Sequence, residues 1–126
     1  MKRSRFGFLL LLILLALSLA VSRGMGRIHE DTAARLDRAA DLALEGNWAG
    51  AAFHSACARR TWDRWALLRG ALADHGPIET LEADFAALEL YASRRETLAF
   101  AALCREMACL AEAIGQAHSW DPKNIL

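Results

Sequence analysis

The chain has 126 residues with fifteen basic and fifteen acidic side chains, a length that allows one small domain plus a targeting segment and excludes a multidomain enzyme. Residues 24–126 carry eleven bases against fifteen acids, and such an acidic body lacks the clustered Lys and Arg that DNA or RNA binding requires. Ala and Leu far outnumber the β-branched residues, which favours helices over strands. The sequence therefore predicts an all-α fold without a nucleic-acid partner.

The amino-terminal segment Phe6 to Val21 contains sixteen residues without a charge. As a helix it covers about 24 Å, and extending it to Met25 gives about 30 Å, the thickness of the hydrocarbon core of a bilayer. The four charges of residues 1–23 are all basic, and three of them precede the apolar run: Lys2, Arg3, Arg5 and Arg23. The apolar length predicts a membrane anchor over residues 1–25. The charge bias predicts its orientation, with a cytoplasmic amino terminus and residues 26–126 outside the cell.

A cleaved signal peptide is the alternative to an anchor. Small residues at Ser18, Ala20 and Ser22 give patterns that a signal peptidase accepts after an apolar run. The run is longer than a typical signal core, which favours the uncleaved anchor.

Gly24 and Gly26 follow the apolar run, and because glycine disfavours helix interiors, we expect the helix to break there and form a flexible joint.

The body is expected to contain four helices. The first runs from Asp31 to Leu44, with Asp31 and Arg35 paired one turn apart, and it closes at Gly46. Asn47 is expected to cap the second and longest helix, which extends from Trp48 to about Asp74 and ends at His75 and Gly76.

Pro77 is expected to open a third helix, whose apolar residues follow a 3,4,3,4 spacing from Ile78 onward. The same spacing resumes at Phe100 with its phase shifted by one residue, and Ser93 and Glu96 between the two runs have the spacing of a capping box. This pattern favours two helices folded back as a hairpin, while one long helix over residues 78–114 is the alternative. The predicted architecture is thus a transmembrane helix followed by a small four-helix bundle or a pair of helical hairpins.

Few side chains suggest chemistry. His54 and Cys57 share a helix face at a spacing that suits two metal ligands, but zinc would need two more, and Cys104 and Cys109 are five residues apart on different faces. Buried thiols packed in the core are the simpler interpretation, and a disulfide between Cys57 and Cys104 is an open alternative. No catalytic or nucleotide-binding motif occurs in the sequence, so we expect no enzyme activity, no cofactor and no small-molecule substrate.

Tryptophan and arginine alternate along the second helix, which suits either an interfacial belt or the core. Trp62 and Trp65, three residues apart, are expected to bury large areas in the core, and Arg59 with Asp63 is expected to form an exposed pair. The segment around Gly46 and Trp48 is also similar to the turn of a tetratricopeptide hairpin, although the chain is too short for a repeat array.

Several positions together resemble the bacterial domain of unknown function 4363 family: Trp62-x-x-Trp65, Asp74-His75-x-x-Ile78, Leu81, Phe85, Leu88-x-x-Tyr91 and Asn124-Ile125-Leu126. The resemblance spans nearly the whole chain and implies a small, membrane-anchored helical protein of Gram-positive, often spore-forming, bacteria. It implies no activity. Trp62, His75, Ile78 and Asn124 are the positions that we expect to matter for the fold or for a partner.

The expected function is that of a non-catalytic helical interaction or accessory module, anchored in the cell membrane and acting on another membrane protein. One alternative is a secreted helical domain released by signal cleavage. A less favoured one is a metal-dependent or thiol-dependent site at His54 and Cys57.

Overall fold

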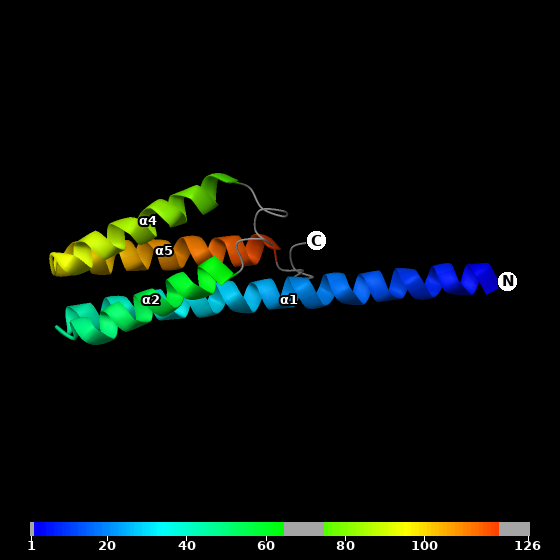
Figure 1. Ribbon diagram of the computed structural model, residues 1–126, viewed down its shortest axis with the longest axis horizontal. Coiled ribbons are helices and arrows are strands. Elements are labelled where there is room, and N and C mark those ends of the chain that lie inside the picture. Colours follow the sequence, from blue (N-terminus) through cyan, green and yellow to red (C-terminus); the bar gives the residue numbers. More distant parts are fainter. Residues whose placement is uncertain (1, 65–74, 119–126) are drawn as a thin grey trace.

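The computed structural model describes residues 2–64 and 75–118, which form four helices and no strand. They are α1 (Lys2–Leu44), α2 (Trp48–Arg64), α4 (His75–Ser93) and α5 (Thr97–His118). The first half of α1 projects from the molecule, and its second half packs with the other three helices (Figure 1). The prediction of an all-α chain, in which an apolar amino-terminal helix is followed by a small bundle of hairpins, is confirmed.

The expected break at Gly24 and Gly26 is wrong, because α1 continues through both residues for 43 residues in all. Two glycines cost a helix only about 2 kcal/mol together. A break would leave several backbone groups without partners, and both flanks favour helix: an apolar segment precedes the glycines and a packed segment follows from His29. The prediction that α2 is the longest helix is therefore wrong as well, since α1 is the longest in the described ranges.

In each hairpin a short turn joins the two helices, and the two turns have the same pattern of backbone hydrogen bonds. After α1, the amide of Gly46 donates to the carbonyl of Ala43 at 3.0 Å, and the amide of Asn47 donates to the carbonyl of Leu42 at 2.8 Å. After α4, the amide of Arg95 donates to Ala92 and that of Glu96 to Tyr91, at 3.2 and 3.0 Å. Both are Schellman motifs, in which one residue adopts positive φ: 82° at Gly46 and 52° at Arg95.

The predicted amino-terminal cap of α2 is confirmed, because the amide of Gly50 donates to the Asn47 Oδ1 at 3.0 Å. The capping box at Ser93 and Glu96 is wrong. Ser93 is the last residue of α4, and its hydroxyl donates to the carbonyl of Leu90 at 2.7 Å instead of reaching α5. The hairpin itself, with helices on either side of residues 94–96, is as predicted.

The predicted boundary between the second and third helices is corrected at one end. His75 and Gly76 lie inside the first turn of α4 and do not close α2. The hydroxyl of Thr80 donates to the carbonyl of Gly76 at 3.1 Å, within that turn. Trp65 and the rest of the predicted extension to Asp74 lie outside the described residues.

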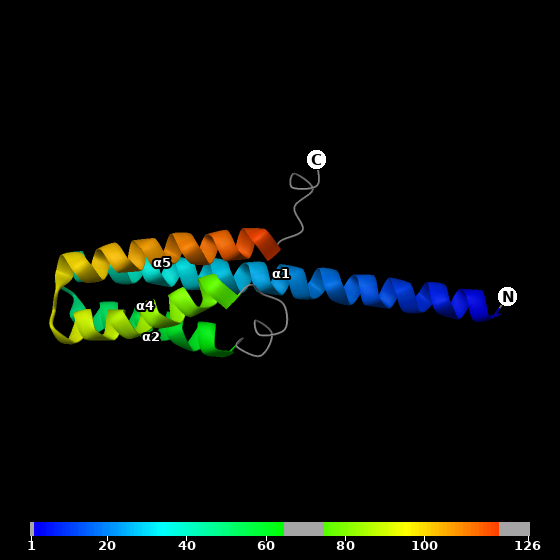
Figure 2. The ribbon, with the colours of Figure 1, turned by 90° about the horizontal axis from the view of Figure 1, so that it is seen from above.

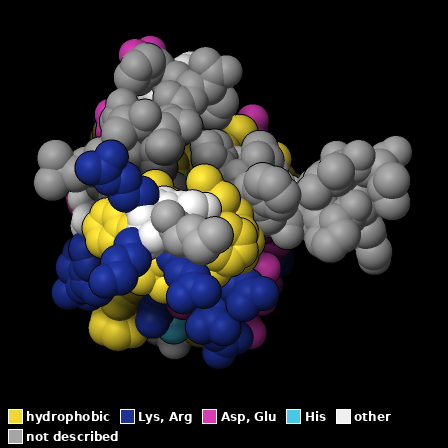
Figure 3. Space-filling model, turned by 90° about the vertical axis from the view of Figure 1, so that its right-hand side faces the viewer, with side chains coloured by type: hydrophobic (Ala, Val, Ile, Leu, Met, Phe, Trp, Pro, Cys, Tyr) yellow, Lys and Arg dark blue, Asp and Glu magenta, His cyan; other side chains and the backbone are white. Residues whose placement is uncertain are grey.

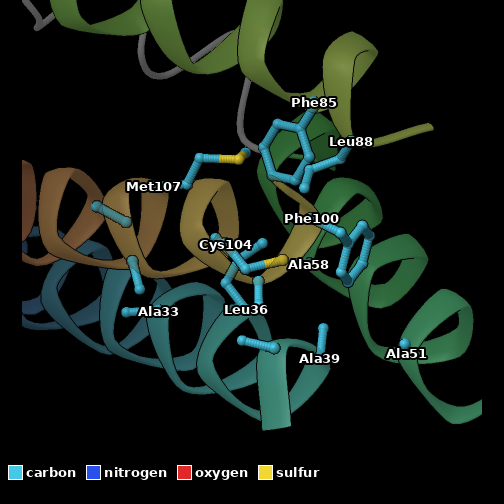
Figure 4. Packing of buried hydrophobic residues seen from close by; sticks show 14 of the residues in the cluster. Ala33, Leu36, Ala39, Ala51, Ala58, Phe85, Leu88, Phe100, Cys104 and Met107 are labelled. Carbon is cyan, nitrogen blue, oxygen red and sulfur yellow. The ribbon is translucent and has the colours of Figure 1, made fainter. Parts of the chain in front are cut away.

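Seen from above, the bundle has two sides, with α1 and α5 on one and α2 and α4 on the other (Figure 2). The second half of α1 packs closely on α2 and α5, whereas α4 packs mainly on α5 and makes few contacts with α2. Alanines on α1 and α2 let the backbones approach, and larger side chains from α4 and α5 fill the remaining space (Figure 4). The fully buried residues include Leu36, Ala51, Trp62, Leu81, Phe100 and Met107.

Exposed ion pairs join elements at the surface of the bundle. The guanidinium of Arg105 on α5 contacts Asp37 Oδ1 at 3.1 Å and Asp41 Oδ1 at 2.5 Å on α1. Both hydrogen bonds raise the pKa of Arg105. The two predicted pairs one helical turn apart, Asp31 with Arg35 and Arg59 with Asp63, are also formed, at 3.4 and 3.5 Å.

Candidate interaction surface

The first half of α1 presents an apolar surface that nothing in the described chain covers. Side chains from Phe6 to Val21 are exposed, with Phe6 at 71% and Leu14 at 58%, and this helix is long and apolar enough to cross a membrane. Figure 3, which faces the end of the molecule from which the amino terminus projects, shows Lys and Arg side chains grouped around apolar ones. The segment therefore has the length, the apolar surface and the basic end of a membrane anchor.

A groove lies between α2 and α4, where the two helices make few direct contacts. We call it the α2–α4 groove; its volume is about 590 Å³ and its lining is Ala52, Ser55, Ala56, Arg59, Arg60, Phe85, Leu88, Glu89 and Ala92. Phe85 and Leu88 form an apolar floor and are each 2% exposed. The short side chains of Ala52 and Ala56 on α2 do not reach across to α4, so the groove stays open above the buried Phe85 and Leu88.

Charged side chains flank the floor of the α2–α4 groove on opposite sides. The guanidinium carbon of Arg59 lies 5.6 Å from the centre of the Phe85 ring, in cation–π geometry. Arg60, next to it on α2, is exposed and donates to the Cys57 sulfur at 3.2 Å. Glu89, exposed on α4, lines the other side. The groove thus has one basic wall and one acidic wall above an apolar floor.

A smaller polar pocket of about 290 Å³ lies at the junction of α1 and α5, beside the start of the apolar half of α1. Its lining residues are Gly26, His29, Glu30, Glu112, Gly115 and Gln116. His29 is buried, and its ring centroid lies 5.9 Å from that of Trp62. Gly115 lets α5 lie close to His29 of α1, since a Cβ added at Gly115 would lie 2.8 Å from the His29 Cβ. The pocket marks where α5 closes against α1.

The residues considered for metal or thiol chemistry do not come together. In residues 2–64 and 75–118, no group of three His, Cys, Asp or Glu side chains is placed to hold a metal ion. The rings of His54 and Phe53 meet edge to face with their centroids 5.4 Å apart. All three cysteines are free thiols, so the disulfide alternative is not formed. Cys104 points inward among Leu36, Ala58 and Phe100 (Figure 4).

Burial governs the reactivity of the Cys104 thiol. Desolvation raises its pKa to about 12, and Asp37 acts in the same direction, while Arg105 opposes the shift. A thiol with this pKa is protonated at neutral pH and is a poor nucleophile or metal ligand. Cys104 therefore belongs to the core, as the simpler sequence interpretation held, but the same interpretation is wrong for Cys109, which is exposed, and Cys57 is only partly buried.

The four positions singled out by the sequence have separate places. Trp62 is 1% exposed and lies in the core, with its ring 6.5 Å from that of Phe85, as predicted. Ile78 packs partly buried against the same core. His75 begins α4, and Asn124 lies outside the described residues. Sequence reasoning missed the α2–α4 groove, whose only signal was the alternation of alanine and arginine along α2.

Comparison with known proteins gave no match: no family model, curated protein or solved structure is similar to this chain.

Proposed function

We propose that the chain is a single-pass membrane protein whose bundle is a non-catalytic interaction module on the outer face of the membrane. One observation carries the proposal: α1 runs without a break from an exposed apolar half into the packed core of the bundle. The helix that suits the membrane is therefore also the central support of the domain. Membership of the domain of unknown function 4363 family, with a Gram-positive source, is part of the same proposal.

The charges around the apolar segment support an orientation. Lys2, Arg3 and Arg5 precede the segment within a few residues, and basic residues are enriched on the cytoplasmic side of membrane spans. Arg23 lies at the other boundary and has a stem long enough to bring its charge to the headgroups. This arrangement favours a cytoplasmic amino terminus and an outward bundle.

In the proposed arrangement the bundle lies close to the membrane surface. Among the α1 residues whose burial the structure describes, His29 is the first buried one, and it comes four residues after Met25, which corresponds to about 6 Å of helix. The polar pocket at Gly26 and Gly115 then lies at the level of the headgroups. A module held this near the bilayer is suited to a partner that is itself a membrane protein.

The decisive experiment expresses the full chain in a Gram-positive host and combines fractionation, intact-mass measurement and protease treatment of cells without their wall. Full-length, membrane-bound protein whose bundle is digested from outside supports the proposal. Full-length protein that is protected in unbroken cells would contradict the orientation. A variant that keeps residues 1–25 and lacks the bundle should recover no partner in a crosslinked pull-down.

A secreted domain is the second candidate function, and one observation favours it. Cleavage near Ala20 to Ser22 would leave all buried residues of α1 in place, because the first of them is His29. The same fractionation tests it, since a soluble product about twenty residues shorter than the full chain would replace the anchored form.

A further inference from the structure

The two walls of the α2–α4 groove carry opposite charges along their length. On α2, Arg60 lines the groove, and Arg64 follows on the same helical face one turn later. On α4, Glu89 lines the groove, and Glu82 lies two turns earlier on the same face. Arg60, Arg64, Glu82 and Glu89 are all exposed. None of the ion pairs formed in the described ranges joins one wall to the other.

An apolar side chain projects beside the basic wall. Phe53 is 57% exposed, and its spacing of three from Ala56 and seven from Arg60 places it at the edge of the groove, beside the residues that line it on α2. Its neighbour Ala52 lines the groove together with Ala92 of α4, so Phe53 lies near the level of Ala92 along the bundle. An exposed phenylalanine at the edge of a groove is suited to contact with a second surface.

A two-fold axis parallel to the groove makes this surface complementary to itself. Rotation about such an axis brings α2 of one copy opposite α4 of the other and leaves the level along the bundle unchanged. Arg59 is level with Phe85, because the guanidinium carbon lies 5.6 Å from the ring centre. Glu82 and Glu89 are three residues before and four residues after Phe85, about 4.5 to 6 Å along the helix. Each basic wall therefore meets an acidic wall at the same level.

We propose that the α2–α4 groove is the contact surface of a symmetric, parallel dimer of this chain. In the dimer, Arg60 of each copy pairs with the Glu82 and Glu89 side of the second copy, and Phe53 packs against Ala92, which lines the groove and is only partly buried. A partner with a single sign of charge would satisfy only one wall, whereas a second copy satisfies both. The inference rests on the proposed membrane function for the parallel arrangement, since the axis leaves both apolar segments pointing into the same membrane.

The test uses the full chain in detergent micelles and measures the monomer–dimer equilibrium by sedimentation over a range of concentrations. Arg60→Glu and Glu89→Arg should each weaken dimerisation at least about tenfold, because each places like charges opposite one another. The double variant should regain a measurable part of the lost affinity, because positions 60 and 89 again carry opposite charges, while Glu82 still faces the reversed charge at position 60. Arg38→Glu, an exposed charge reversal on α1, is the matched control and should leave dimerisation unchanged.

Phe53→Ser provides a second variant that keeps the core intact, since Phe53 is exposed, and it should also weaken dimerisation. A chain that is monomeric throughout, single reversals without effect, or a double variant that fails to recover would each overturn the inference. Membrane fractionation of the same variants separates this failure from failure of the proposed function. A monomer that stays full-length in the membrane would overturn only the dimer inference. A soluble, shortened chain would overturn the proposal of an anchored module.

Discussion

Arg95 occupies in the turn between α4 and α5 the position that Gly46 occupies in the turn between α1 and α2. Both residues adopt positive φ, 52° and 82°, and both close a Schellman motif with the same pattern of backbone hydrogen bonds. Glycine adopts this conformation without steric cost, whereas the Cβ of arginine makes it unfavourable. The second hairpin is thus built on the same turn as the first but carries local strain that the first avoids.

Replacing Arg95 by glycine should therefore stabilise the protein by about 0.5 to 1 kcal/mol, as glycine removes the penalty of the left-handed conformation. The free energy of unfolding of the full chain in micelles, measured with urea, checks this. Arg94→Gly is the matched control: Arg94 lacks positive φ, so the substitution should give no gain. Equal destabilisation by both variants would contradict the account of this turn.

Gly115→Ala should destabilise the bundle by about 1 to 3 kcal/mol, although alanine favours helix over glycine. The added Cβ would lie 2.8 Å from the His29 Cβ, so α5 would have to move away from α1. At Gly24 and Gly26, an added Cβ meets nothing within 4 Å. Alanine there should raise the melting temperature or leave it unchanged, and a loss of stability at both sites would argue against a continuous α1.

Asp84 on α4 should make the protein less stable as the pH rises. Burial and the nearby Glu106 raise the pKa of Asp84 above its ordinary value of 3.8. Between the pKa that Asp84 has in the unfolded chain and the higher pKa that it has in the folded protein, the folded state binds more protons than the unfolded state. The free energy of unfolding therefore falls as the pH rises through this range. Asp84→Asn should raise the free energy of unfolding at pH 7 by less than about 1 kcal/mol and should have no effect near pH 3. Glu79→Gln, exposed on the same helix, is the control, and urea unfolding at both pH values is the measurement.

Thiol alkylation should distinguish the cysteines of α5. Cys109 is exposed and should react within minutes at pH 8, whereas Cys104 is buried with a pKa of about 12 and should react only when the chain unfolds. Mass spectrometry of peptides from native and denatured samples checks this. Rapid modification of Cys104 in the native protein would show that the core around Leu36 and Ala58 is open.

Local features of the sequence predicted local structure well. Asn47 and Gly46 marked a real turn, and the phase shift between the two apolar runs correctly indicated a hairpin around residues 94–96. The helix break predicted from Gly24 and Gly26 is wrong, because the low helix propensity of glycine costs little free energy compared with what the packing of α1 from His29 onward contributes.

Features that depend on how helices pack were beyond the sequence. The contact of Arg105 with Asp37 and Asp41 joins residues more than sixty positions apart and exists because α5 lies along α1. The α2–α4 groove exists because these two helices do not close on each other, and no spacing within either helix shows that. The candidate surface was therefore visible only in the structure.

The unbroken path of α1 also fixes the direction in which the α2–α4 groove opens. Figures 1 and 2 show that α2 and α4 run alongside the second half of α1. A groove between two such helices faces sideways from the bundle axis. In an anchored chain that axis continues into the bilayer without a swivel, so the groove opens roughly parallel to the membrane plane. Encounters with a partner would then occur by lateral diffusion in two dimensions, and any tilt of the membrane helix would tilt the groove with it.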